Sequence, residues 1–180
     1  MTDSRTDPLP DPHTDSRTGP RTDAPTDPRT QLRIEPLTSD SPAALVNDWQ
    51  HVHNTVVPVD SARLSADDVR ERAGRNVLEV AYAGDVLVGC STVRTPKDDG
   101  VGMVISRVLA AHRGRGFGTV LYERGLAAAR ALGAREIETV VLTSNTAGLS
   151  FARRTGFTVE VDRYRLDGDT VDWVELRLAP

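Results

Sequence analysis

Apolar residues recur with regular periods over residues 31–180, and these periods predict both strands and helices. We expect a strand where apolar and β-branched residues fill a short run, and a helix where apolar residues recur every three or four positions. The expected strands are Leu32–Leu37, Val77–Ala83, Val86–Val93, Val101–Leu109, Ile137–Thr143, Val159–Leu166 and Val171–Leu178. The expected helices are 42–54, a short helix between Ser65 and Gly74, 117–132 and 146–155.

Turn residues separate these elements at the places where the periods break. Gly84-Asp85 and Asp167-Gly168 are tight-turn signals between two strand runs, so each predicts an antiparallel hairpin. Gly133 stands where a glycine commonly ends a helix. The resulting order is β–α–α–β–β–β–α–β–α–β–β, with a strand–helix–strand crossover between the hairpins. This order predicts an α/β fold with a mixed sheet, and not an all-parallel doubly wound sheet.

The first 30 residues differ in composition from the rest of the chain. They contain six of the eleven prolines, and the unit Thr-Asp-Ser-Arg-Thr occurs at both 2–6 and 14–18. A segment with so few aliphatic residues cannot bury enough apolar surface to offset the entropy of ordering it. We therefore expect residues 1–30 to be a disordered N-terminal tail, with a binding tail as the alternative, and 31–180 to be one domain.

Composition and charge narrow the classes of partner and compartment. The formal net charge is −4, which argues against a nucleic-acid surface. Cys90 is the one cysteine, so a reducing, cytoplasmic setting is the simplest expectation. No apolar run is long enough for an ordinary transmembrane helix, and no secretory signal opens the chain. We expect no nucleic-acid partner and no membrane partner.

The strongest chemical signal is the run Arg113-Gly114-Arg115-Gly116-Phe117-Gly118, between an expected strand and an expected helix. Glycines let the backbone approach a ligand closely, and the first turn of a helix offers unpaired N–H groups and a positive dipole end. The two arginines add charge and fork-shaped donors. Together these features suit a diphosphate.

Spacing excludes two other phosphate loops. A dinucleotide fingerprint counted from Gly114 needs glycine where Thr119 stands, and no stretch of the chain fits the P-loop pattern. A glycine-rich turn that serves packing alone remains open when the glycines are considered by themselves.

The wider sequence resembles the GCN5-related N-acetyltransferase (GNAT) family. Residues 108–118 are similar to its motif A, V-x-P-x-x-R-G-x-G-x-G/A, with Ala110 in place of the proline. Residues 145–157 are similar to its motif B, and Asn145, Phe151, Gly156 and Phe157 match in register. The expected element order over 31–180 also agrees with the family.

The resemblance implies a mostly antiparallel sheet that splays between strands four and five, with acetyl-CoA in the cleft and no metal ion. Main-chain groups of Val108 and Ala110 would pair with the pantetheine arm, and Asn145 would contact this arm while also fitting a helix N-cap. The residues expected to bind the cofactor are Val108, Leu109, Ala110, Arg113, Gly114, Arg115, Gly116, Phe117, Gly118, Thr119, Asn145 and Phe151.

The family's usual reaction is direct attack of an amine on the thioester, and here its acid–base residues are open. Many members carry a tyrosine as general acid where this chain has Ala152. The candidate catalytic residues are Glu79, Ser106 and Tyr164, against the plainer readings of a solvated strand carboxylate for Glu79 and a strand aromatic for Tyr164. A main-chain N–H near Val108–Leu109 could polarise the carbonyl.

Further polar residues complete the candidates. His51 or His53, near the end of the first helix, could be the base, and Arg107 is the other polar residue of the fourth strand. Tyr122 lies one turn into the helix that follows the glycine-rich run.

The sequence thus predicts an N-acetyltransferase that acetylates a primary amine of a small molecule or protein. The alternative is a catalytically weak acetyl-CoA-binding regulatory module, because the usual tyrosine and a strand-four carboxylate are missing. An RNA-binding role for the Arg-Gly run is disfavoured by the acidic charge and the few aromatic residues. A homodimer is compatible with the sequence.

Overall fold

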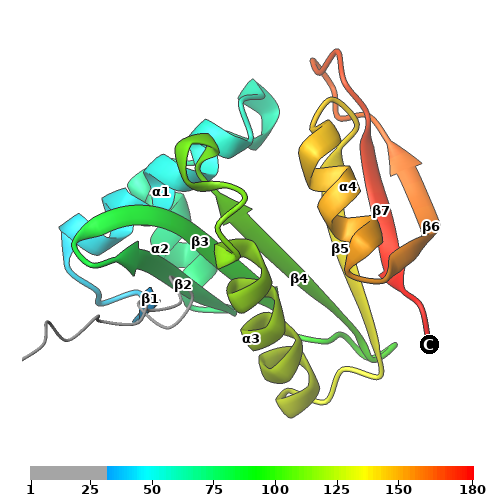
Figure 1. Cartoon of the computed structure of the whole chain (residues 1–180), viewed down its shortest axis with the longest axis horizontal. Helices are drawn as coiled ribbons and strands as arrows, with labels where there is room; N and C mark the ends of the chain where they lie inside the picture. Colours follow the sequence, from blue (N-terminus) through cyan, green and yellow to red (C-terminus); the bar gives the residue numbers. More distant parts are fainter. Residues whose placement is uncertain (1–31) are drawn as a thin grey trace, which may run out of the picture.

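The computed structural model describes residues 32–180 and shows a seven-stranded sheet flanked by four α-helices (Figure 1). The predicted tail, 1–30, lies outside the described residues. The strands are β1 (Leu32–Leu37), β2 (Asn76–Ala83), β3 (Val86–Arg94), β4 (Val101–Val108), β5 (Glu136–Leu142), β6 (Phe157–Tyr164) and β7 (Trp173–Leu178). The helices are α1 (Ala43–Val56), α2 (Ala66–Ala73), α3 (Phe117–Ala131) and α4 (Thr146–Arg154), with short 3-10 helices η2 (Asp60–Ala62) and η3 (Ala110–His112).

The sheet has the order β1-β2-β3-β4-β5-β7-β6. All neighbouring strands are antiparallel except β4 and β5, which are parallel and connected through α3. The fold class predicted from the sequence, an α/β mixed sheet, is therefore confirmed. The inserted position of β7 between β5 and β6 joins the C-terminal hairpin to the rest of the sheet.

The parallel pair β4–β5 is joined over a short stretch only. Its ladder covers Val101–Met103 against Glu136–Glu138, at the start of both strands. Figure 1 shows the two strands diverging beyond this point, so that the sheet opens like a V with β1–β4 on one side and β5–β7 on the other. The expected splay between strands four and five is thus present.

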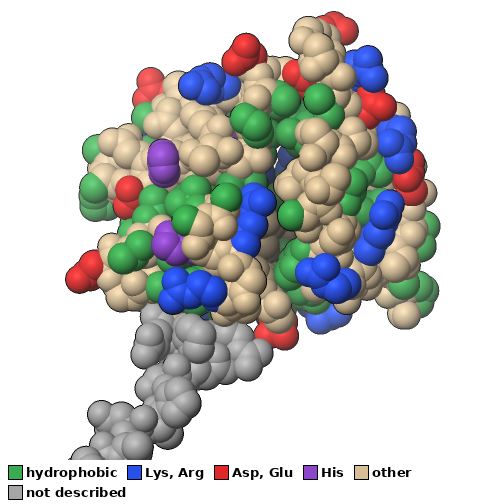
Figure 2. Space-filling model, turned by 45° about the horizontal axis from the view of Figure 1, so that its top comes forward, with side chains coloured by type: hydrophobic (Ala, Val, Ile, Leu, Met, Phe, Trp, Pro, Cys, Tyr) green, Lys and Arg blue, Asp and Glu red, His purple; other side chains and the backbone are tan. Residues whose placement is uncertain are grey.

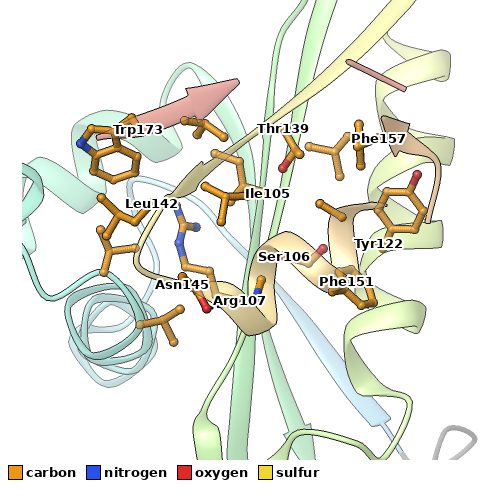
Figure 3. Close-up of a pocket in the computed structure, with 17 residues that line it drawn as sticks. Ile105, Ser106, Arg107, Tyr122, Thr139, Leu142, Asn145, Phe151, Phe157 and Trp173 are labelled. Atoms are coloured by element: carbon orange, nitrogen blue, oxygen red, sulfur yellow. Dashed lines mark hydrogen bonds between the residues drawn. The ribbon is translucent and has the colours of Figure 1, made fainter. Parts of the chain in front are cut away.

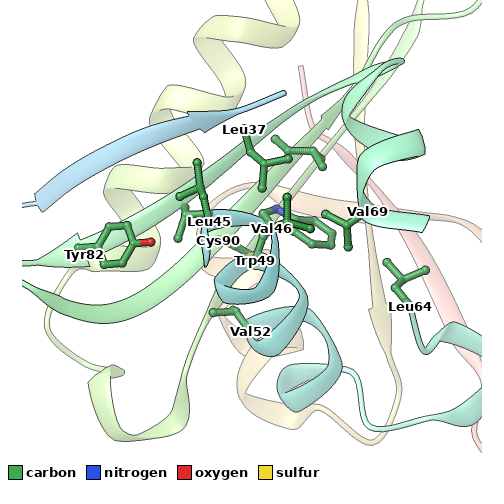
Figure 4. Close-up of a cluster of buried hydrophobic side chains, with 11 residues drawn as sticks. Leu37, Leu45, Val46, Trp49, Val52, Leu64, Val69, Tyr82 and Cys90 are labelled. Carbon is green, nitrogen blue, oxygen red and sulfur yellow. The ribbon is translucent and has the colours of Figure 1, made fainter. Parts of the chain in front are cut away.

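Helices cover both faces of the sheet and bury the core against it. On one face α1 places Val46, Trp49 and Val52 in a cluster with strand residues such as Val80 and Cys90 (Figure 4). On the other face α3 and α4 pack against β4, β5 and β6, around buried aliphatic and aromatic side chains. No helix in the described part of the chain is long and apolar enough to span a membrane.

Local sequence signals explain where several elements begin and end. Ser65 caps α2, and its hydroxyl accepts a bond from the Asp68 N–H at 3.2 Å while the Asp68 carboxylate accepts from the Ser65 N–H at 2.7 Å. This is the capping box that helix starts favour. Gly133 follows the end of α3 with φ +90°, as its place after the last apolar residue predicted.

The C-terminal strands differ from their predicted bounds. β6 begins earlier, at Phe157, because this side chain is buried and its backbone pairs with Leu178. β7 begins later, at Trp173, opposite Leu142 at the end of β5, and one further bond from the Thr143 N–H to the Asp172 carbonyl at 2.9 Å closes this ladder. The antiparallel pairing itself was predicted correctly, but the turn at Gly168 lies within a longer loop.

Candidate active site

The edge of β4 that faces the opening carries main-chain groups without a strand partner. On the other edge β4 pairs with β3, and the Leu109 N–H donates to the Val88 carbonyl at 3.0 Å. Successive residues of a strand direct their amides to opposite edges. The N–H and C=O groups of Ser106 and Val108 therefore face the opening, where the Val108 carbonyl accepts a bond from Arg113 Nε at 3.1 Å.

The glycine-rich turn lies at the end of this edge and starts α3. Gly114 and Gly116 have φ +77° and +83°, a left-handed conformation that glycine adopts without strain. Nothing lies within 4 Å of a Cβ built on Gly114, so the space in front of the turn is open. Gly116 is the N-cap of α3 and no side chain caps this helix end. The amides of this turn and the positive helix end suit an anion, and the diphosphate site expected from the sequence stays a prediction.

A cavity of about 440 Å³ lies in front of this turn, between α3, α4 and the end of β4. Figure 2 shows a hollow running down this face of the molecule, with Lys and Arg side chains on both sides of it. Nine of the residues predicted to bind the cofactor line this cavity: Val108, Arg113, Gly114, Gly116, Phe117, Gly118, Thr119, Asn145 and Phe151. Leu109, Ala110 and Arg115 belong to the same segment but are not among its lining residues.

Asn145 serves as the N-cap of α4. Its Oδ1 accepts a bond from the Gly148 N–H at 3.0 Å. The capping role proposed from the sequence is therefore confirmed, and because Asn145 also lines the cavity, a ligand contact is compatible with it. Phe151, further along α4, reaches across to α3, where its ring lies 3.5 Å from the position of a Cβ on Gly118.

A second cavity of about 80 Å³ continues the first one through the opening of the sheet (Figure 3). The two share Ser106, Arg107, Asn145 and Phe151 among their lining residues. In Figure 3, Leu142 and Trp173 lie on one side of this cavity, whereas Tyr122 and Phe157 lie on the other. The junction of the two cavities is thus the place where a donor and an acceptor can meet.

Of the three predicted catalytic residues, Ser106 is the one that the structure places in the cavities. Its Oγ is buried and has no hydrogen-bond partner within residues 32–180. A buried hydroxyl without a partner is costly unless a ligand or water completes it. Ser106 is therefore positioned to bond a bound molecule, and its catalytic role stays a prediction.

Glu79 and Tyr164 lie outside both sets of lining residues. The Glu79 carboxylate accepts bonds from Arg124 Nη2 at 2.7 Å and from Ser91 Oγ at 3.1 Å. The Tyr164 hydroxyl bonds to Glu175 Oε1 at 3.3 Å, and burial together with this carboxylate raises the pKa of Tyr164. The geometry gives both side chains partners away from the cavities, so it does not favour their predicted catalytic roles.

The position of the usual motif B tyrosine is filled by a methyl group. Ala152 is 4% exposed and lines the smaller cavity. Tyr122 lines the same cavity, but its hydroxyl donates to the Thr155 carbonyl at 2.9 Å, and burial raises its pKa. Neither residue presents an unbonded acid to the junction of the cavities.

His53 is held as a neutral imidazole in the core beneath the opening. Its ring stacks on Trp49 at 5.3 Å between centroids, and its Nε2 lies 2.8 Å from the Ala62 carbonyl. Burial and the positive charge of Arg107 lower the pKa of His53 to about 3. His51, the other histidine of α1, is exposed.

Three ionisable residues that line the cavities were not singled out as ligand contacts from the sequence. His112 and Arg154 line the larger cavity, and the His112 Nδ1 is buried without a partner in the described chain. Arg107 lines both cavities and is 8% exposed. The signal for Arg107 was present in the sequence as a lone charge within the apolar run Val101–Leu109.

Comparison with known proteins assigns the chain to a family. The sequence profile of the Acetyltransferase (GNAT) family matches residues 42–157. No curated protein sequence matches the chain.

Solved structures share the fold at low sequence identity. The GNAT domain of S. lividans PAT is 24% identical, with a TM-score of 0.60 over 82% of this chain and 90% of that one. An acetyltransferase of Bacillus subtilis in complex with CoA is 23% identical, with a TM-score of 0.59 over 82% and 97%. YncA of Salmonella typhimurium, solved with its cofactor acetyl-CoA, is 17% identical, with a TM-score of 0.63 over 82% and 93%.

Proposed function

The chain belongs to the GNAT family of acetyltransferases, and we propose that it transfers an acetyl group from acetyl-CoA to an amine of a second substrate. The observation that carries this proposal is the parting of β4 from β5 beside the anion site at the start of α3. The parting leaves a free strand edge for an extended arm, and the helix end suits a diphosphate at one end of that arm. Two of the structurally similar proteins were solved with CoA or acetyl-CoA.

The residues present fit acetyl-CoA. The left-handed backbone conformation of Gly114 and Gly116 exposes main-chain amides to the diphosphate, and Arg113 adds a cation beside it. The N–H and C=O groups of Ser106, which have no strand partner, and the second lone pair of the Val108 carbonyl, which already accepts from Arg113 Nε, would bond the amides of the pantetheine arm as an added strand does. Phe151 would cover the arm from α4.

When bound, acetyl-CoA supplies a thioester whose acetyl carbon forms a bond to the amine nitrogen as the bond to sulfur breaks. The protein has to provide a donor for the carbonyl oxygen and a proton for the leaving sulfur. We assign the first task to the Val108 N–H, because the Leu109 N–H already donates to Val88. We assign the second to Ser106, whose buried hydroxyl has no partner among the described residues; as it gives its proton to the sulfur, its oxygen takes up the proton that the amine nitrogen loses.

The alternative function, a regulatory module that binds acetyl-CoA with little turnover, is favoured by one observation. The position of the usual acid is Ala152, and the nearby Tyr122 hydroxyl is bonded to the backbone. A general acid is typically worth about 10²–10⁴-fold in rate, so its absence would slow transfer markedly.

Release of free thiol from acetyl-CoA separates the two functions. The panel of acceptors contains primary amines, amino acids and peptides with a free amino terminus. We expect some of them to raise the rate of thiol release above the rate measured without amine. Calorimetry on the same sample measures acetyl-CoA binding. Tight binding with no amine-dependent thiol release would favour the regulatory module, and no binding would contradict both functions.

A further inference from the structure

Arg107 is a buried cation at the wall of the cavities. It lies on β4, next to Ser106, and its side chain is directed to the face of the sheet that α1 covers, where its guanidinium group lies 5.7 Å from the Trp49 ring. In Figure 3 the guanidinium group lies on the same side of the cavity as Leu142 and Trp173. This side is opposite the α3 side, so a molecule bound here approaches the junction from the other direction than CoA does.

No carboxylate in the described part of the chain neutralises this charge. Within residues 32–180, Arg107 forms no ion pair, and its one hydrogen bond to another side chain runs from Nη1 to Thr92 Oγ1 at 3.2 Å. Its Nε is buried and has no partner in the described chain. Burial raises the pKa of the neighbouring Cys90 thiol to about 11, so this thiol is neutral at pH 7 and supplies no negative charge.

The surroundings add to the positive potential at this place. Burial and the charges of Arg94 and Arg107 lower the pKa of Arg72, and burial and the charge of Arg107 lower the pKa of His53, which remains neutral. A buried cation without a partner is strongly unfavourable, whereas the same cation paired with a carboxylate forms two short parallel bonds. The Arg107 Nε, which has no partner in the part described, and the adjacent Nη2 have the fork geometry that matches a carboxylate.

We propose that Arg107 binds a carboxylate of the acceptor, so that the acceptor is a small molecule which carries both an amine and a carboxylate, such as an amino acid. The proposal rests on the proposed acetyl transfer and names the substrate class for it. The smaller cavity is about 80 Å³ and meets the donor cavity at Ser106 and Arg107. In an acceptor whose carboxylate is bound at Arg107, only a few covalent bonds separate that carboxylate from the amine, so the amine lies close to the junction.

The remaining walls of the smaller cavity agree with this class. On the side of Arg107 they are apolar: Val57, Ile105, Leu142 and Trp173. Such walls suit the carbon skeleton of a small acid and offer no carboxylate that would attract a second cation. A polyamine, which carries several positive charges and no acid, would meet an unpaired guanidinium group here and be repelled.

The test compares amino acids with their carboxamides, and because the amine of a carboxamide is less basic, each kcat/KM is expressed per neutral amine. Thiol release is measured for a series of amino acids and for their carboxamides, and the ratio of kcat/KM within each pair gives the preference for the acid. This ratio cancels any change in folding or in acetyl-CoA binding. We expect the wild type to prefer the acid by about 10- to 100-fold, the range of charge-assisted bonds.

Three variants locate this preference. Arg107→Met removes the charged end while keeping an unbranched chain as far as the position of Nε and should bring the ratio close to one, whereas Arg107→Lys keeps the charge without the fork and should retain part of the preference. Arg130→Met, at the exposed far end of α3, is the control for loss of a positive charge and should keep the wild-type ratio. Equal turnover of acids and carboxamides by the wild type, or an unchanged ratio in Arg107→Met, would overturn the proposal.

A binding measurement decides the proposal if no amine is turned over at all, a result that would count against the proposed transfer itself. The CoA-loaded wild type and Arg107→Met are titrated with N-acetylalanine, which resembles a product, and with its carboxamide. We expect the acid to bind the wild type at least about tenfold more tightly than it binds Arg107→Met, and the carboxamide to show no such difference. Equal affinities of the acid for both proteins would overturn the carboxylate site.

Discussion

At the residue scale, buried polar atoms without protein partners gather where β4 and β5 part. Ser106 Oγ, Arg107 Nε, His112 Nδ1 and His53 Nδ1 form this group in the part of the chain that the structure describes. Buried polar groups in folded proteins are generally paired, so such a cluster indicates a place completed by ligands or water. Three of the four residues line the cavities.

His53 makes the stability of the protein depend on pH. Burial and Arg107 lower its pKa to about 3, from 6.5 in an unfolded chain. The unfolded state therefore binds a proton that the folded state does not between these values, and the free energy of unfolding falls as pH decreases through this window, by up to about 1.4 kcal/mol per pH unit. Above pH 6.5 the imidazole is neutral in both the folded and the unfolded state, so the stability is not reduced by this effect.

Urea unfolding at pH 7, 6 and 5 measures this dependence. Between pH 6.5 and 5 we expect the free energy of unfolding to fall less for His53→Gln, which cannot be protonated, than for the wild type. The slopes of the two pH profiles should differ by the contribution of about one bound proton. Parallel pH profiles for the two proteins would show that His53 does not titrate as its burial implies.

Arg113 tests the anion site directly. Arg113→Glu places a carboxylate beside the expected diphosphate in exchange for a cation, and we expect the acetyl-CoA affinity to fall by at least about 10- to 100-fold, the value of a charge-assisted bond. Arg130→Glu, on the exposed end of the same helix, makes the same change in net charge and is the control. If calorimetry gave equal acetyl-CoA affinities for both variants, the glycine-rich turn would not be the diphosphate site.

At the element scale, the close contact of β3 with β4 holds the free edge of β4 in place. A Cβ on Gly89 would lie 2.4 Å from the Arg107 carbonyl oxygen, a distance that requires the backbone to shift. We expect Gly89→Ala to lower the free energy of unfolding by about 1–3 kcal/mol, as overpacking does. Gly74→Ala is the matched control, because Gly74 has helical φ and its Cβ would be 3.4 Å from the nearest atom. Equal effects of both substitutions on urea unfolding would contradict this packing.

Elements with strong local signals were the ones that the sequence predicted best. The capping box at Ser65 and the glycine at 133 have short-range causes, and so does the start of α4 at Asn145. The bounds of β6 and β7 were displaced because distant contacts decide them, such as the pairing of Phe157 with Leu178. The 3-10 helices η2 and η3 left no periodic signal of their own.

At the scale of the whole molecule, the donor side of the site was predictable and the acceptor side was not. The donor side lies within the continuous stretch 108–119 and the start of α4, so a motif can carry it. The acceptor side is assembled from Val57, Ile105, Leu142 and Trp173, which come from four distant parts of the chain. Their meeting depends on the order of the strands and on the parting of β4 from β5.

The central claim is that this cleft moves an acetyl group from CoA to an amine, and following the acetyl group itself tests it most directly. The protein is incubated with isotopically labelled acetyl-CoA and a mixture of amino acids, peptides and other primary amines, and the products are identified by mass spectrometry. The account predicts labelled N-acetyl amines in a one-to-one ratio with released CoA. Label that remains on CoA, or that appears only as free acetate, would contradict it.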